Sequence, residues 1–103
     1  GWFRFTVLRS ALDLAASFEE VAPVAIAMVA AGHRSIVDHE SGPILFRAFS
    51  GGYDPAHSLT SAQRALLRAF VDTDEATGSI GGNRLWFRAT GLPENREGIA
   101  ALL

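Results

Sequence analysis

The chain contains no cysteine and no lysine. The lack of cysteine excludes disulfide bonds, thiolate metal sites and cysteine nucleophiles, and it fits a reducing compartment, so we expect a cytoplasmic protein. The lack of lysine argues against a nucleotide site, since no lysine is present to reach a phosphate. The glycine-rich stretches also lack the spacing of a phosphate loop. The longest apolar run, Val21–Ala31, is about half of the ~20 residues that a membrane-spanning helix needs. We therefore expect no membrane span and no bound cofactor.

Charge of either sign is also modest. Nine basic and eleven acidic residues leave a formal net charge of −2. Such a balance gives no general attraction to phosphate, so binding to nucleic acid or to an anionic membrane surface is disfavoured. Of the 103 residues, 49% are hydrophobic, which is enough for one compact core in a chain of this length. We expect residues 1–103 to form a single domain.

Apolar residues recur at helical spacing through most of the chain, and no stretch gives convincing strand alternation. Gly32 and Gly91 are placed as helix stops, and the glycine-rich stretch 51–58 is a loop. The residues from 72 to 82, which include three glycines, are interpreted as a turn. The predicted helices cover residues 3–16, 17–31, 43–50, 60–72, 83–91 and 93–103.

Two pairs of residues mark helix starts by reciprocal capping. Ser17 stands three residues before Glu20, and the same spacing of a hydroxyl and an amide occurs over residues 60–63. Pro23 lacks an amide donor and is tolerated only in the first turn of a helix. The regular part of the second helix is therefore expected to begin nearer Ala22.

The second and fourth predicted helices are the candidates for the centre of the core. From Val21 to Ala31 almost every residue is apolar, so no side of this helix is expected to face water. The fourth helix has one apolar stripe and one charged stripe. We place Val24, Met28, Leu66 and Phe70 at the centre.

A Phe-Arg pair occurs three times, at Phe3, Phe46 and Phe87, with separations of 43 and 41 residues. Such an interval holds one helical hairpin with its loops, and a shift of 41 residues superposes the second predicted helix on the fourth. We expect each ring to be buried, with the arginine methylenes along the same surface. The predicted fold is all-α, with five or six helices stacked as antiparallel hairpins. The alternative is that so short a pair recurs by accident in an ordinary helical bundle.

The stretches "LTSAQRALLRAFVD" and "NRLWFRATGLPENREGIAALL" resemble the terminal repeats of HEAT-like α-helical proteins, found as uncharacterised open reading frames in high-GC bacteria. The resemblance covers residues 59–103 and extends to the first half by hydrophobic pattern. It implies a fragment of a right-handed α-α superhelix, the C-terminal part of a longer array, that acts through its surfaces and has no catalytic residues. Pro23 departs from the pattern because it interrupts a helix.

The Phe-Arg pairs and the chain ends supply the candidate binding residues. Arg47 and Arg88 are expected to line one face, where the guanidinium fork suits the carboxylates of a protein partner. Trp2, Trp86 and Leu103 fall near the chain ends, where a longer stack would continue, so exposed members of this set would favour self-association. The preferred function is a protein-interaction or scaffolding module, with Arg47, Arg88 and Trp86 as its binding residues.

One cluster of titratable residues supports an enzymatic alternative. His33, Asp38, His39 and Glu40 could hold a metal ion or move a proton. Three of them are consecutive, so they cannot all point one way on a regular element. The His-Glu-x-x-His spacing of zinc proteases is absent. A polar approach to the third helix explains the cluster better, and we do not expect an enzyme.

The other alternative is a DNA-binding regulator, because "RATGLP" resembles the turn of a bacterial helix-turn-helix protein. That motif needs a small residue four positions before its glycine and an aliphatic residue six positions after it. Phe87 and Glu97 occupy these positions. A buried unpaired carboxylate would cost several kcal/mol, so nucleic acid is an unlikely partner.

Overall fold

The computed structural model describes residues 17–32, 41–77 and 79–103. All regular structure within these ranges is helical, which confirms the all-α prediction. The helix predicted over residues 3–16 lies outside the described residues. The described helices are α2 (Phe18–Ala30), α3 (Ser41–Ala48), α4 (Ser61–Thr77), α5 (Ser79–Ala89) and α6 (Arg96–Ala100).

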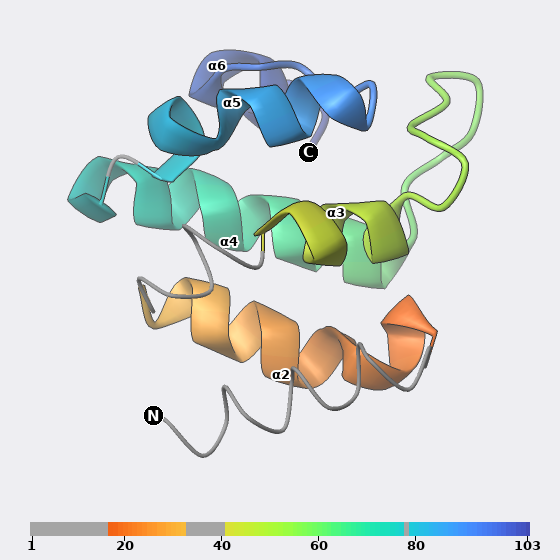
Figure 1. Ribbon diagram of the computed structural model, residues 1–103, viewed down its shortest axis with the longest axis horizontal. Helices are drawn as coiled ribbons and strands as arrows, with labels where there is room; N and C mark the ends of the chain where they lie inside the picture. Colours follow the sequence, from red (N-terminus) through yellow and green to blue (C-terminus); the bar gives the residue numbers. More distant parts are fainter. Residues whose placement is uncertain (1–16, 33–40, 78) are drawn as a thin grey trace.

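Helix α4 lies between α2, below it in Figure 1, and α5 and α6, above it. Two pairs of consecutive helices pack on each other, α2 on α3 and α4 on α5. Alternate helices also touch, since α2 packs on α4 and α3 on α5. Chain direction reverses from each of these helices to the next, so α2 and α4 run the same way in Figure 1. Two antiparallel hairpins, α2–α3 and α4–α5, thus lie side by side, with α6 packed on α4.

Helix α2 begins directly after its N-cap residue, Ser17, ahead of the proline. The Ser17 hydroxyl accepts a hydrogen bond from the Glu20 amide at 3.4 Å and donates one to the Glu20 carboxylate at 3.2 Å. The expectation that regular helix begins nearer Ala22 is wrong, because α2 runs from Phe18 through Pro23 without a break. Pro23 is exposed, so water can satisfy the Glu19 carbonyl that the proline nitrogen cannot.

The expectation that no side of α2 faces water is also wrong. Pro23, Ala27 and Ala30 are exposed and form one face of the helix. Alanine has little apolar surface, so a row of small residues can border water at low cost. An apolar run therefore does not by itself indicate a helix buried on every side.

The core takes buried side chains from all five described helices. Met28, Leu66 and Phe70 are almost wholly buried, as predicted, whereas Val24 is only partly buried. The ring of Phe70 meets that of Phe87 edge to face, with centroids 5.3 Å apart. This contact between α4 and α5 combines apolar burial with the favourable geometry of an aromatic pair.

The turn predicted between residues 72 and 82 is largely helical. Helix α4 continues to Thr77, and α5 begins at Ser79, so Asn83 lies inside α5 and does not cap it. The buried Thr73 hydroxyl donates a hydrogen bond to the carbonyl of Val29 at 2.9 Å, near the end of α2. A polar residue that looks like a helix stop in sequence thus has a buried partner, and tertiary contact overrides local propensity.

The starts of α3 and α6 also differ from the proline positions at which they were expected. Helix α3 begins at Ser41, two residues before Pro43, and ends at Ala48. Helix α6 begins at Arg96 because the Asn95 side chain accepts a hydrogen bond from the Gly98 amide at 2.6 Å. An asparagine cap decides this boundary in preference to an upstream proline.

The two described Phe-Arg pairs occupy different environments. Phe87 is fully buried, whereas Phe46 is 48% exposed. The expectation that each Phe ring is buried is therefore wrong at Phe46, because the neighbouring Ile44 and Leu45 are the residues of α3 that enter the core. Phe3 lies outside the described residues. The 41-residue offset aligns the buried faces of α2 and α4, since Ala25, Met28 and Val29 map onto Leu66, Ala69 and Phe70, but it does not align those of α3 and α5.

Candidate functional site

Three large hydrophobic side chains are exposed among those that the structure describes, one on α3 and two consecutive ones on α5. Leu85 is 62% exposed, Phe46 48% and Trp86 40%. The Phe46 and Trp86 rings meet edge to face, with centroids 6.0 Å apart. Leu85 precedes Trp86 on α5. We call Phe46, Leu85 and Trp86 the α3–α5 face.

A glycine in α3 holds the indole in place. A Cβ atom added at Gly42 would lie 2.6 Å from the Trp86 ring, so the ring rests on the bare backbone of α3 at this point. Phe46 follows Gly42 by one helical turn and therefore lies on the same side of α3. The indole is thus confined between a backbone surface and a second aromatic ring while part of it remains open to solvent.

A basic ridge runs along α5 beyond Leu85, on the side of the helix opposite Trp86. Arg84 and Arg88 are both exposed and are one helical turn apart. The Arg88 guanidinium donates two hydrogen bonds to the Glu94 carboxylate, with distances of 2.6 and 2.8 Å. Arg88 therefore binds a carboxylate of its own chain in the structure, in the forked geometry that was predicted for a partner.

Charge coupling at this ridge shows in the pKa values. The hydrogen bond from Arg88 lowers the pKa of Glu94, and the positive charges of Arg88 and Arg84 act in the same direction. The same hydrogen bond, followed by the charge of Glu94, raises the pKa of Arg88. Glu94 is therefore the anion shared by two cations, and the ridge as a whole carries an excess of positive charge.

A groove borders the other side of the face, between the first turn of α2 and the end of α3. Its volume is about 500 Å³. Phe46 belongs to both the groove and the aromatic contact with Trp86, so the groove is continuous with the α3–α5 face. Arg47, one of the predicted binding residues, is half-buried in the wall of the groove. The groove is lined by Ser17, Phe18, Glu19, Glu20, Phe46, Arg47 and Ser50.

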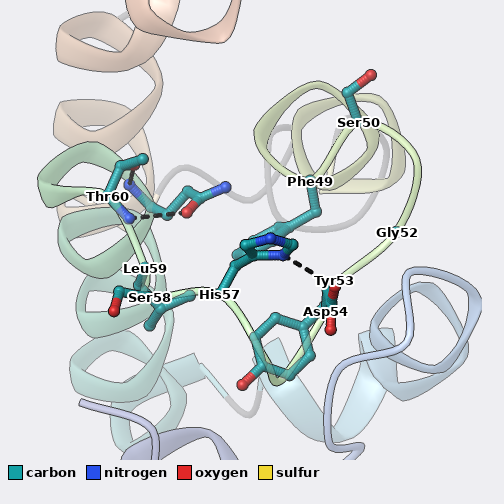
Figure 2. Close-up of a pocket in the computed structure, with 10 residues that line it drawn as sticks. Phe49, Ser50, Gly52, Tyr53, Asp54, His57, Ser58, Leu59 and Thr60 are labelled. Atoms are coloured by element: carbon teal, nitrogen blue, oxygen red, sulfur yellow. Dashed lines mark hydrogen bonds and ion pairs between the residues drawn. The ribbon is translucent and has the colours of Figure 1, made fainter.

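A second cavity, of about 210 Å³, lies beside the loop between α3 and α4 (Figure 2). His57 Nδ1 is 2.8 Å from a carboxylate oxygen of Asp54, and the other oxygen accepts the Ala56 amide at 2.9 Å. A histidine bonded to a carboxylate is the arrangement of a general base. In Figure 2, however, the Ser58 hydroxyl points away from the imidazole. The His57 side chain is 82% exposed, so this pair orders a surface loop.

The loop itself is fixed at both ends. The Tyr53 amide donates a hydrogen bond to the Thr90 carbonyl at 2.7 Å, which ties the loop to the end of α5. At the other end Thr60 and Gln63 form the predicted capping box, with distances of 2.8 and 3.1 Å. The side-chain amide of Gln63 (Nε2) also donates a hydrogen bond to the carbonyl of Ala48, the last residue of α3, at 2.7 Å. The cavity therefore lies among loop residues that these hydrogen bonds hold in place.

The remaining sequence candidates do not join the α3–α5 face. His33, Asp38, His39 and Glu40 lie outside the described residues. In the ranges that are described, no group of three or more histidine and acidic side chains could hold a metal ion. Leu103 is partly buried against the core.

The region of the helix-turn-helix alternative lies at α5 and α6. Phe87 is buried in the core, Glu97 is exposed, and α6 has only five residues, which is short for a helix that reads a DNA groove.

None of the described helices combines the length and the apolar character needed to cross a bilayer.

Sequence reasoning named Trp86 but missed Phe46 and Leu85. Leu85 falls on the same side of α5 as Arg88, three residues away, and this helical spacing was the signal that it faces outward. Phe46 was missed because the repeat of the Phe-Arg pair assigned it to the core.

Comparisons of the chain with protein-family models, with curated proteins and with solved structures give no match.

Proposed function

We propose that this protein is a non-catalytic protein-interaction module that binds its partner through the α3–α5 face. The observation that carries the proposal is the contact between the exposed rings of Phe46 and Trp86 across two adjacent helices, with the exposed Leu85 next to Trp86 on α5. Contiguous exposed apolar patches mark interaction sites, and aromatic residues and arginine are enriched among the residues that dominate binding energy.

The anchoring of Trp86 supports this proposal. Its ring is held against Gly42 and Phe46 before any partner arrives. Little side-chain entropy is then lost when the ring is covered, so more of the apolar burial is available as binding free energy. Arg88, three residues from Leu85 on α5, is a polar neighbour of that part of the face, as the rims of such interfaces have.

The fold supports the same assignment. Side-by-side antiparallel hairpins are the unit of HEAT-like solenoids, and we propose that this chain is part of such a stack. Proteins of that architecture present extended surfaces for binding. The absence of cysteine from the sequence is consistent with the cytoplasm as its compartment.

A photo-crosslinking amino acid at position 85 tests the proposal in cells of the organism that encodes the chain. The matched control carries the same group at Arg68, which is exposed on α4. We expect covalent adducts with a defined protein from position 85 and far fewer from position 68. Equal yields from the two positions would contradict an interaction surface on α3 and α5.

A further inference from the structure

The groove that adjoins the α3–α5 face contains a carboxylate without a partner among the described residues. Glu19 is exposed in the first turn of α2, and no hydrogen bond or ion pair within the described ranges engages its side chain. Glu20, the other acidic residue of that turn, accepts a hydrogen bond from the Ser17 hydroxyl at 3.2 Å. Of the two carboxylates that line the groove, that of Glu19 is therefore free to meet a cation from outside the chain.

The side chains that line the groove leave an excess of negative charge. Glu19 and Glu20 contribute two negative charges, and Arg47 contributes one positive charge, so one negative charge remains. The glutamates stand at the amino end of α2 and Arg47 in the last turn of α3, which are the helix ends that favour anions and cations respectively. The dipoles of the two helices oppose each other at the groove, and the excess carboxylate decides its sign.

An aromatic surface belongs to the same groove. Phe46 lines it, and 48% of this residue is exposed. The ring faces of aromatic side chains attract cations, and a guanidinium group can stack on such a face while its forked donors bind a carboxylate. An ammonium group is more strongly hydrated and lacks the planar fork. A carboxylate and a phenyl ring in one groove therefore suit arginine better than lysine.

We infer that the partner of the α3–α5 face is a protein segment that presents an arginine beside an apolar residue. The guanidinium lies in the groove with Glu19 and Phe46, and the apolar side chain covers Trp86. The inference rests on the proposed function, because Phe46 belongs to both the groove and the face. An acidic segment would be repelled by the excess carboxylate, and a wholly apolar one would remove that carboxylate from water without a partner, so charge complementarity favours a basic segment.

Selection from a phage-displayed library of short random peptides, on the 103-residue chain, tests the inference. We expect the enriched peptides to contain arginine next to an apolar residue. The same selection on Glu19→Arg should enrich acidic peptides, because two guanidinium groups then face one carboxylate in the groove. Glu97→Arg is the matched control, since Glu97 is exposed in the first turn of α6, and it should enrich the same peptides as the wild type.

Fluorescence anisotropy of a labelled peptide from that selection then separates the contributions of charge and of the ring. Glu19→Gln should raise the dissociation constant by about fivefold, the upper range for an exposed ion pair. Replacing the arginine of the peptide by lysine should weaken binding to the wild type. Phe46→Leu should reduce this preference for arginine, because leucine keeps the apolar contact but has no ring. Circular dichroism confirms that each variant is folded at the temperature of the assay.

Two results would overturn the inference and leave the proposed function standing. One is enrichment of acidic or purely apolar peptides on the wild type, with binding lost in Trp86→Ala. The other is an arginine peptide that binds Glu19→Arg as tightly as the wild type but is lost in Trp86→Ala. If no peptide is enriched, or if binding is unaffected by both substitutions, the inference and the proposed function fail together.

Discussion

The same dipeptide, Phe-Arg, serves opposite purposes on α3 and on α5. Phe87 packs edge to face on Phe70 in the core, whereas Phe46 packs edge to face on Trp86 at the surface. Both rings make the same kind of aromatic contact, but only one of them is removed from water. The position of a residue around its helix, and not its local sequence, decides whether it stabilises the fold or remains available to a partner.

The largest expected effect is the contrast between two alanine substitutions. Phe87→Ala should lower the free energy of unfolding by about 3–5 kcal/mol, because it leaves a cavity in the core. Phe46→Ala should cost only about 1 kcal/mol, the order of one aromatic pair. Denaturant unfolding of both variants measures the difference, and similar losses would remove the distinction between the two sites.

The role of Gly42 gives the next effect. Within a helix, alanine normally stabilises by about 1 kcal/mol relative to glycine. Here we expect Gly42→Ala to destabilise by about 1–3 kcal/mol, since the new methyl group would overlap the Trp86 ring.

A double-mutant cycle isolates that contact. In a Trp86→Ala background the overlap is gone, so Gly42→Ala should become neutral or stabilising. The same cost in both backgrounds would show that the indole does not rest on α3 in solution, and the anchored Trp86 of the α3–α5 face would be lost.

The smallest effect concerns the ridge. Because pairing with Arg88 lowers the folded-state pKa of Glu94, the pair adds stability above the unfolded pKa of this carboxyl, and the contribution disappears as pH falls through the folded pKa. Melting temperatures of wild type and Glu94→Gln should therefore differ slightly at neutral pH and converge in acid. A difference that persists at low pH would indicate a role other than charge pairing.

The elements that sequence predicted well are those governed by short-range pattern. Met28, Leu66 and Phe70 were placed in the core by helical spacing, and reciprocal capping formed as expected at Thr60 and Gln63. Ser17 caps the Glu20 amide as expected, but the Glu20 carboxylate accepts from the Ser17 hydroxyl and not from its amide. These features depend on neighbours within one or two turns, so a single sequence contains the information.

The failures share a different cause. The stretch containing Gly81 and Gly82 was interpreted as a turn, but it lies at the start of α5, in contact with the rest of the fold through α4. Thr73 falls within the predicted turn, but its hydroxyl donates a hydrogen bond to the Val29 carbonyl. The candidate site depends on the approach of α3 to α5, which brings Gly42 under Trp86, and no local pattern specifies that approach.

Quenching of Trp86 fluorescence by acrylamide, in a Trp2→Phe chain, tests most directly whether the α3–α5 face is open to a partner. The account predicts quenching between that of a buried indole and that of free tryptophan, because the ring is 40% exposed and packs on Gly42 and Phe46. Quenching as slight as that of a buried indole would contradict it.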